Sequence, residues 1–461
     1  MSQYEQYLSP FSWRYGSSEM RRIWSEANKR LTWRRVWVAL ARVQSGFGLV
    51  TADQLAELER NQDNLDIERA LHIEAEIHHD LMAELKTFAE QCPLGGGILH
   101  LGATSMDVED NAEAIRLRQS LSLLQIRLRE ILDIFAGRIE QYADTPVMAF
   151  THLQPAEPST LGYRLAFYAQ DLLEDYHALS GLTVRGKGFK GAVGTGAAYA
   201  DLIGLEHMAD FEAQLSRQLG LPFFPVTSQT YPRRQDFTIL NHLSSIAVPL
   251  YKLAFDLRLL QSPSLGEWSE PFGERQVGSS AMPFKRNPIQ SEKIDSLARA
   301  LCVAPQVAWQ NASHSLLERT LDDSANRRTL LPEAFLAVDE LLVTARRILS
   351  GMKVSDTAIQ RNLANYAPFA CTERVMMAAV KAGADRQVAH ERLREHALTA
   401  WAEIQAGRPN PLVAALAGDA YFLGFLSAGQ IQALSTVEDY VGIAPHSARA
   451  LAAAIRETIK T

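Results

Sequence analysis

The chain has 461 residues, of which 47% are hydrophobic, and a formal net charge of -7. This length and composition predict a large buried core divided into two or three domains, and the mildly acidic balance argues against a nucleic-acid scaffold. Cys92, Cys302 and Cys371 are too few and too far apart for a disulfide framework or a CxxC metal site. Arg14 and Arg21 interrupt a polar N-terminus, and no apolar run reaches the roughly 20 residues that span a bilayer. We therefore expect a soluble, reduced, intracellular protein without a secretory signal.

Apolar residues recur at helical spacing in the first half of the chain. One stripe lies between Asn111 and Pro146, and its gaps alternate between four and three residues. This spacing is typical of a helix that packs along its length against other helices. A shorter stripe over residues 161–179 follows Thr160, a residue type that caps helices. The sequence predicts one helix over each stripe.

Two more stripes follow. The stripe over residues 239–260 contains Pro249, which should kink the helix without ending it. A further helix is expected to begin near Pro332, because proline suits the first turn, and to run to about Gly351. Two of the expected helices exceed about 25 residues, well above the average of roughly 11–12. No run of alternating β-branched residues competes with them, so an all-α fold is predicted.

Long helices with heptad patterns indicate an elongated bundle. Such stripes often bury against partner subunits as well as against their own chain, so an oligomer is expected, with a monomeric bundle as the alternative. We expect an N-terminal helical domain over residues 1–104, a central long-helix bundle over 105–354 and a C-terminal helical domain over 355–461. The first boundary falls in the Gly-rich stretch PLGGGILHLGATS.

Four segments interrupt the helical pattern and concentrate polar groups. The first, Val277 to Pro288, reads VGSSAMPFKRNP, and Ser279, Lys285 and Asn287 in it could all face one anionic group. A solvated loop explains the same composition equally well. The second, FTHLQPAEPSTLG, places His152 in a Pro-bounded turn before a helix, where a surface histidine is more common than a catalyst.

The third segment is IHHD, expected within a charged helix that puts His72, Glu76 and His79 on one face. This face could mimic a metal site, but no fourth ligand or zinc motif accompanies it, so no metal is expected. The fourth segment, ERTLDDSANRR, could gather phosphate oxygens through its arginines and Ser324, or could be a solvated helix start. A further glycine-rich run, GAVGTG, lacks the Walker lysine and is a weak nucleotide fingerprint.

Together these segments closely resemble one enzyme family. GSSAMPFKRNP resembles the signature loop of the fumarase/aspartase superfamily, whose members eliminate fumarate from succinyl-type substrates. The segments THLQPAEPSTLG, HLGATSMDVEDN, TSQTYPRRQD, ERTLDDSANRR and SPFSWRYGSSEM resemble the adenylosuccinate lyase family of the eukaryotic type. The signature loop alone indicates only the superfamily, whereas the other segments select this member, and the resemblance covers essentially the whole chain.

The resemblance implies an all-α, three-domain fold in which four subunits join their bundles into a tetrameric core. Each active site would then draw loops from three subunits. The implied activity is the release of fumarate from adenylosuccinate, giving AMP, and from succinylaminoimidazole carboxamide ribotide, in purine biosynthesis. The resemblance also implies a cytoplasmic homotetramer that needs no metal or cofactor and binds neither nucleic acid nor membrane.

The same resemblance implies the roles of particular residues. Ser279 matches the catalytic base, His152 the general acid, and His79 a second histidine that positions the substrate, while Lys285 would stabilise the ionised serine. Lys285 and Asn287 would also hold the succinyl carboxylates. Residues matching the remaining substrate contacts are Thr104, Ser105, Thr151 and Gln229, and those at the nucleotide-phosphate end are Arg14, Tyr15, Arg319, Ser324 and Arg328.

Four positions depart from the family pattern: Met106, Asp107, Gly196 and Lys293. None removes a catalytic group, but they leave open the balance between the two substrates. Two alternatives also remain at this point. One is a sister lyase acting on argininosuccinate, aspartate, malate or a cycloisomerase substrate, which the phosphate-type arginine and serine set disfavours. The other is a structural protein that kept the fold and lost the chemistry, which the intact Ser279, His152 and Lys285 set disfavours.

Overall fold

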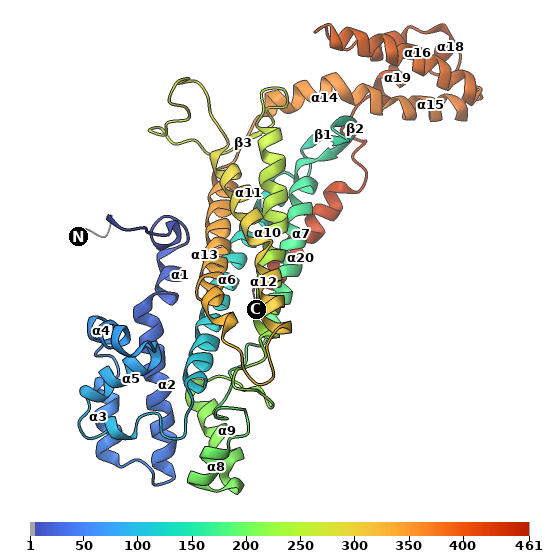
Figure 1. Ribbon diagram of the computed structural model, residues 1–461. Helices are drawn as coiled ribbons and strands as arrows, with labels where there is room; N and C mark the ends of the chain where they lie inside the picture. The colour runs from blue at the N-terminus through green and yellow to red at the C-terminus, as the bar shows by residue number, and fades with distance from the viewer. Residues whose placement is uncertain (1–4, 461) are drawn as a thin grey trace. The chain divides into compact units, whose positions relative to one another are not determined.

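The computed structural model describes residues 5–460, and its ribbon is almost entirely helical (Figure 1). The chain divides into two compact units, each built from separate stretches of sequence. The first unit comprises Met1–Arg127, Asp175–Val248 and Leu297–Val343, and the second comprises Leu128–Glu174, Pro249–Ser296 and Thr344–Thr461. Within the described residues, no helix combines the length and the apolar character needed to cross a membrane. The expected all-α fold is confirmed, whereas the division into three domains stays a prediction.

Five helices contribute residues to both units, and four of them were expected from the apolar stripes. In the first long helix, the residues of the apolar stripe are the buried ones: Leu117, Leu124, Leu128, Ile131 and Phe135 are all fully buried. The hydroxyl of Thr160 accepts a hydrogen bond from the Tyr163 amide at 3.1 Å, which confirms its capping role. The five helices are α6 (Ser105–Gln141), α7 (Leu161–Ser180), α10 (Arg234–Leu260), α11 (Ile289–Leu301) and α13 (Asp322–Gly351).

One of these helices begins earlier than the sequence suggested. Helix α13 starts at Asp322 rather than near Pro332, so the proline lies inside it. Proline removes one hydrogen bond and crowds the preceding turn, but Leu331 and Phe335 on either side are fully buried. Their packing holds the helix through the proline, as it does in α10, where Pro249 is also internal as expected.

One apolar core joins several of the remaining elements of the first unit. Trp37, Leu58, Phe88, Val108 and Phe211 belong to this core, which joins the N-terminal helices to the start of α6 and to α9. Side chains of residues between the helices cap their first turns, for example Ser25 before α2 and Thr51 before α3. These elements are η2 (Pro10–Ser12), α1 (Ser18–Ile23), α2 (Glu26–Gly46), α3 (Ala52–Asn61), α4 (Ile67–Ile77), α5 (Asp80–Glu90), η3 (Gly96–Ile98), α8 (Ala197–Ile203), η4 (Leu205–His207), α9 (Met208–Leu219) and α12 (Ala304–Ser313).

The second unit contains all four strands and the C-terminal helices. β1 pairs with β2 in an antiparallel hairpin that contacts α14, and β3 pairs with β4. A separate apolar core, which includes Val375, Ala389, Leu412, Phe422 and Ile431, holds the C-terminal helices together. The elements are β1 (Pro146–Thr151), β2 (Gln154–Thr160), β3 (Trp268–Ser269), β4 (Lys353–Val354), α14 (Asp356–Ala370), α15 (Thr372–Lys381), α16 (Arg386–Gln405), α17 (Leu412–Ala417), α18 (Ala420–Leu423), α19 (Ala428–Leu434) and α20 (Ala444–Ile459).

Candidate active site

The first unit contains a cavity of about 770 Å³ at the N-terminal ends of three helices. This volume lies within the range of small-molecule sites. The start of α5 contributes His79 and Asp80, the start of α6 contributes Ser105, and the start of α13 contributes Ser324. Seven of the residues predicted from the sequence line this one cavity: His79, Thr104, Ser105, Gln229, Arg319, Ser324 and Arg328.

His79 lies between two helices, not within one as the sequence suggested. His78 adopts a left-handed conformation, with φ of 54°, that ends α4, and His79 caps α5. The Nδ1 atom of His79 accepts a hydrogen bond from the Met82 amide at 3.4 Å, and its Nε2 atom lies 3.3 Å from the Ser105 hydroxyl. Because Nδ1 accepts, a neutral ring carries its proton on Nε2 and donates to Ser105.

The break between α4 and α5 also separates the three residues considered for a metal. His72 and Glu76 remain neighbours on α4, with Nδ1 and a carboxylate oxygen 3.5 Å apart, whereas His79 lies beyond the end of that helix. Among residues 5–460, no group of three or more His, Cys, Asp or Glu side chains is arranged to hold a metal ion.

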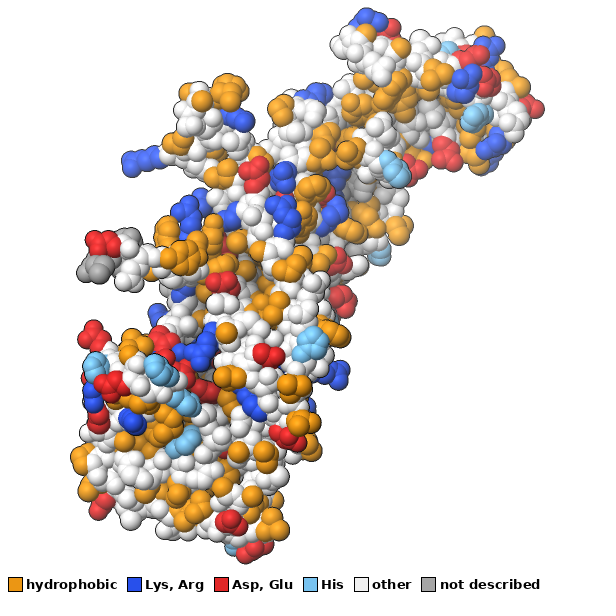
Figure 2. All heavy atoms as spheres, in the orientation of Figure 1, with side chains coloured by type: hydrophobic (Ala, Val, Ile, Leu, Met, Phe, Trp, Pro, Cys, Tyr) orange, Lys and Arg blue, Asp and Glu red, His pale blue; other side chains and the backbone are white. Residues whose placement is uncertain are grey.

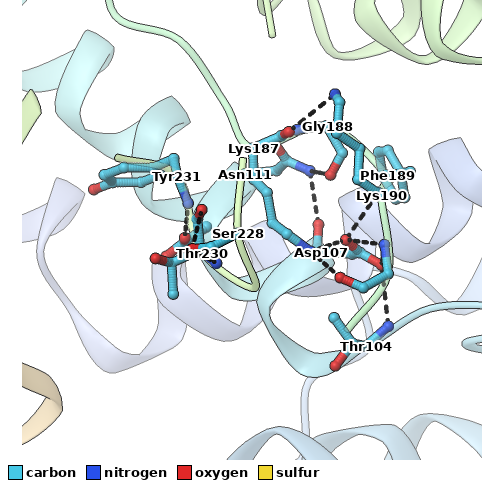
Figure 3. A network of polar contacts seen from close by, with 12 residues as sticks. Thr104, Asp107, Asn111, Lys187, Gly188, Phe189, Lys190, Ser228, Thr230 and Tyr231 are labelled. Carbon is cyan, nitrogen blue, oxygen red and sulfur yellow. Dashed lines mark hydrogen bonds and ion pairs between the residues drawn. The ribbon is translucent and has the colours of Figure 1, made fainter. Parts of the chain in front are cut away.

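A buried ion pair fixes the start of α6, which carries Thr104 and Ser105. The Asp107 carboxylate accepts a hydrogen bond from the Thr104 amide at 3.0 Å and pairs with the Lys187 ammonium group, and both charged side chains are fully buried (Figure 3). Asp107 also accepts from the Lys190 and Gly191 amides, each at 3.2 Å. Asp107, one of the residues that depart from the family pattern, therefore joins the glycine-rich loop after Lys187 to the cavity wall.

Asn111, one turn further along α6, holds the same loop. Its side-chain amide donates to the Gly188 carbonyl and accepts from the Gly188 amide, both at 3.0 Å (Figure 3). The backbone of residues 188–191 therefore binds side chains of α6, and the loop holds this helix without a nucleotide.

A second buried network joins three of the recognised segments at the cavity wall. Arg233 bridges Asp110 at 2.9 Å and Asp323 at 2.7 Å. Arg327 pairs with Asp236 at 2.7 Å and donates to the Tyr231 hydroxyl at 2.8 Å. Because buried charges need such partners, this network accounts for Arg233, Asp236 and Asp323, which do not line the cavity.

Charged side chains of both signs line the cavity itself, and Figure 2 shows acidic, basic and histidine side chains together near α4 and α5. Arg328 pairs with Asp80 at 2.8 Å. Burial raises the pKa of Asp80, but the attraction of Arg328 outweighs it and leaves the pKa below its ordinary value. Burial, together with the nearby charges of Asp80 and Asp110, raises the pKa of Glu109 to about 8.

Arg14 and Tyr15 lie in the first unit but outside the residues that line this cavity. The following Gly16 amide donates to a carboxylate oxygen of Glu340 at 2.9 Å, so the segment is held against α13. Arg14 is exposed, and its guanidinium group lies 5.4 Å from the centre of the Trp13 ring. These two predicted phosphate contacts are not brought together with Arg319 and Arg328.

The second unit carries the predicted base in the loop between β3 and α11. The Ser279 hydroxyl accepts hydrogen bonds from the Met282 amide at 3.1 Å and from the Ala281 amide at 3.4 Å. The Asn287 side chain donates to the Gly278 carbonyl at 3.0 Å and closes the base of this turn. Lys285 is exposed, and within the described part of the chain no ion pair or hydrogen bond joins its ammonium group to Ser279.

His152 and Thr151 lie at the tip of the β1–β2 hairpin. Thr151 pairs with Gln154, so His152 and Leu153 form a two-residue turn, and their φ angles of 53° and 59° match the type I′ geometry of tight hairpins. The sequence predicted the turn before α7 but not the strands, because two prolines in β2 are unusual except where a strand has a free edge. His152 is exposed to solvent.

Several cavity residues were missed from the sequence. Glu109, Glu113 and Arg116 lie four, eight and eleven residues after Ser105, a spacing that places them on the same face of α6. That periodicity was available in the sequence once Ser105 was chosen. Trp24, Lys29 and Trp33, by contrast, come from α2 and its preceding turn, and only tertiary packing brings them to the cavity.

Comparison with known proteins agrees with the helical fold and identifies similar enzymes. A lyase family model matches residues 16–302, and a model of the adenylosuccinate lyase C-terminus matches residues 368–450. Adenylosuccinate lyase of Schistosoma mansoni is 41% identical over 431 residues, which cover 92% of this chain and 89% of the relative. The Saccharomyces cerevisiae enzyme is 38% identical over 457 residues, which cover 96% of this chain and 94% of the relative.

A solved structure shares the fold. The 3-carboxy-cis,cis-muconate lactonizing enzyme of Pseudomonas putida superposes with a TM-score of 0.86 at 24% identity, covering 98% of this chain and 99% of that one. The helical architecture and the matching family model define a lyase of the fumarase/aspartase superfamily. Within that superfamily, the chain belongs to the adenylosuccinate lyase family.

Proposed function

We propose that this chain eliminates fumarate from adenylosuccinate, giving AMP, and from succinylaminoimidazole carboxamide ribotide. The observation that carries the proposal is the cavity of the first unit, where the starts of α5, α6 and α13 meet beside Arg319 and Arg328. Helix N-termini carry partial positive charge and free amide groups, so they attract anions. A nucleotide with a phosphate and two carboxylates suits such a cavity.

The first chemical step is removal of a weakly acidic proton from the succinyl carbon next to a carboxylate. Ser279 takes this proton as an alkoxide, which the Ala281 and Met282 amides stabilise through the hydrogen bonds they already make to its oxygen. The electron pair of the broken C–H bond moves into the neighbouring carboxylate. Lys285, whose side chain is exposed, supplies positive charge for that group.

The second step breaks the bond between the neighbouring carbon and the purine nitrogen. The electrons stored in the carboxylate form the carbon–carbon double bond of fumarate, and those of the C–N bond leave with the nitrogen. An amine anion leaves poorly, so it needs a proton at that moment. His152 is the proposed donor, because a protonated imidazole carries an N–H that it can give up.

The remaining predicted residues hold the substrate. His79 donates to the Ser105 hydroxyl and so orients it, and Thr104 lies beside it at the start of α6. Gln229 on the cavity wall, with Thr151 and Asn287 in the second unit, is proposed to contact the succinyl group. Arg319, Ser324 and Arg328 bind the phosphate, and Arg14 and Tyr15 are proposed to reach the phosphate end of a site formed with another subunit.

We further propose a homotetramer with shared active sites. Large hydrophobic side chains are exposed on the long helices, and Figure 2 shows such side chains over them. Exposed apolar surface of this extent favours burial against another chain. His152 is exposed at a hairpin tip, and most side chains of the loop that carries Ser279 are exposed. Such exposure is expected of groups that complete the active site of a neighbouring subunit. The exposed side chains are Ile126, Tyr163, Phe167, Val248, Phe255 and Leu259.

A substrate panel tests the proposed function. The purified chain is incubated in turn with adenylosuccinate, succinylaminoimidazole carboxamide ribotide and argininosuccinate, and fumarate is measured by its ultraviolet absorbance. Turnover of both nucleotides is expected, with none of argininosuccinate, because that substrate has no phosphate for Arg319 and Arg328. An Arg319→Gln variant should raise KM for the nucleotides without changing which substrates react. Turnover of argininosuccinate alone would overturn the proposal.

A further inference from the structure

Glu109 is the one carboxylate in the wall of the first-unit cavity, among the described residues, that has no cation paired with it. The other five acidic side chains each have a partner: Glu26 with Lys29 at 2.7 Å, Glu74 with Arg30 at 3.4 Å, Asp80 with Arg328 at 2.8 Å, Asp110 with Arg233 at 2.9 Å, and Glu113 with Arg116. An unpaired carboxylate would repel the anionic substrate that the cavity is proposed to bind.

The surroundings of Glu109 favour its neutral form. Charged groups from four helices act on it: Asp80 from α5, Asp110 from α6, Arg328 from α13 and Lys29 from α2. The two cations are already engaged by Glu26 and Asp80, so the two carboxylates and burial dominate. His79 and the paired Glu113 also line the cavity. A neutral carboxyl group carries an O–H donor, which an ionised one lacks.

The position of Glu109 places this donor among the substrate contacts. It lies one helical turn after Ser105 on the same face of α6, and both residues line the cavity with Arg328. We propose that Glu109 positions the bound nucleotide as a neutral hydrogen-bond donor to an anionic oxygen of the substrate, so that binding weakens when this carboxyl ionises. The identity of the ligand rests on the proposed function.

The expected pH dependence follows from the raised pKa. Because the pKa of Glu109 is about 8, the group is protonated at pH 7 and ionised above pH 8. At pH 9 roughly one molecule in ten keeps the proton, and an affinity that needs the protonated form falls about tenfold. AMP is a suitable probe, because its phosphate is already dianionic above about pH 7 and its own charge stays constant.

The experiment measures the AMP dissociation constant by titration calorimetry and the KM of adenylosuccinate, from pH 7 to pH 9.5. For the unmodified chain, both should rise about tenfold between pH 7 and pH 9. Glu109→Gln keeps a neutral donor at every pH, so both constants should stay flat over this range. Glu109→Leu lacks the donor, so its constants should be flat but already raised at pH 7.

Asp133→Asn, which removes an exposed carboxylate from the same helix, is the matched control and should keep the pH dependence of the unmodified chain. If Glu109→Gln and the control show the same rise with pH, the role of Glu109 is wrong. The role of Glu109 is also wrong if the unmodified chain releases fumarate but its AMP dissociation constant and its KM do not change with pH. If no variant releases fumarate or binds AMP at any pH, the proposed function fails and this inference fails with it.

Discussion

Replacement of Lys187 by methionine should destabilise the first unit strongly. Lys187 and Asp107 are both fully buried, and the ammonium group also donates to the Gly191 carbonyl at 2.8 Å. Removing one partner of a buried ion pair typically costs about 3–5 kcal/mol, because the other charge is left uncompensated. Asp107 would keep the Thr104, Lys190 and Gly191 amides and the Tyr199 hydroxyl as donors. We therefore expect a loss of about 3 kcal/mol, at the lower end of that range.

The neighbouring Lys190 provides a matched control. Its ammonium group pairs with Glu212 at 2.6 Å, but Glu212 is about one-quarter exposed, so Lys190→Met should cost only about 1 kcal/mol. Equilibrium urea unfolding, followed by circular dichroism at one protein concentration, measures both losses. Adding Asp107→Asn to Lys187→Met should recover part of the stability, since a neutral amide needs no counter-charge. A Lys187→Met variant no less stable than Lys190→Met would refute the reasoning.

Three further predictions concern catalysis, assembly and packing. His152→Ala should lower kcat by at least ~100-fold, the usual effect of losing an acid–base partner, while the exposed His446→Ala keeps normal turnover; equal rates for the two would remove His152 from the mechanism. Mixing inactive Ser279→Ala and His152→Ala proteins should restore part of the fumarate release if the two groups come from different chains, and no recovery after verified subunit exchange would contradict shared sites. Gly162→Ala should lower the free energy of unfolding, measured in urea, by about 1–3 kcal/mol, because a Cβ there would lie 2.6 Å from the Ala143 Cα atom. Gly137→Ala in α6, where a Cβ meets no atom within 4 Å, should be neutral or stabilising, and a loss equal to that of Gly162→Ala would contradict the packing.

The helical architecture could be predicted because burial repeats along the sequence. The stripe positions of α6 and α10, such as Leu124 and Leu250, are fully buried, so heptad spacing located these helices. The start of α13 was missed, because proline is most common at a first turn, yet packing of Leu331 and Phe335 carries the helix through Pro332. Such tertiary support leaves no local signal.

The candidate site could be predicted only in part. The resemblance selected His79, Ser105, Arg319 and Arg328, which the structure brings to one cavity. It did not indicate the buried partners that hold them, such as Lys187 beneath Asp107. A lysine in a glycine-rich loop has no sequence feature that distinguishes a buried ion pair from a solvated charge. The roles of Ser279 and His152, both outside that cavity, remain predictions.

The most direct test of the account is fumarate release by the Ser279→Ala variant. Ser280→Ala removes the adjacent hydroxyl, which is exposed, and serves as the matched control. Each protein is mixed in excess with adenylosuccinate, and fumarate is quantified over time. We predict that Ser279→Ala forms fumarate at least ~100-fold more slowly than both the unmodified chain and Ser280→Ala, although it still binds AMP. A folded Ser279→Ala protein that releases fumarate at the unmodified rate would contradict the proposed mechanism.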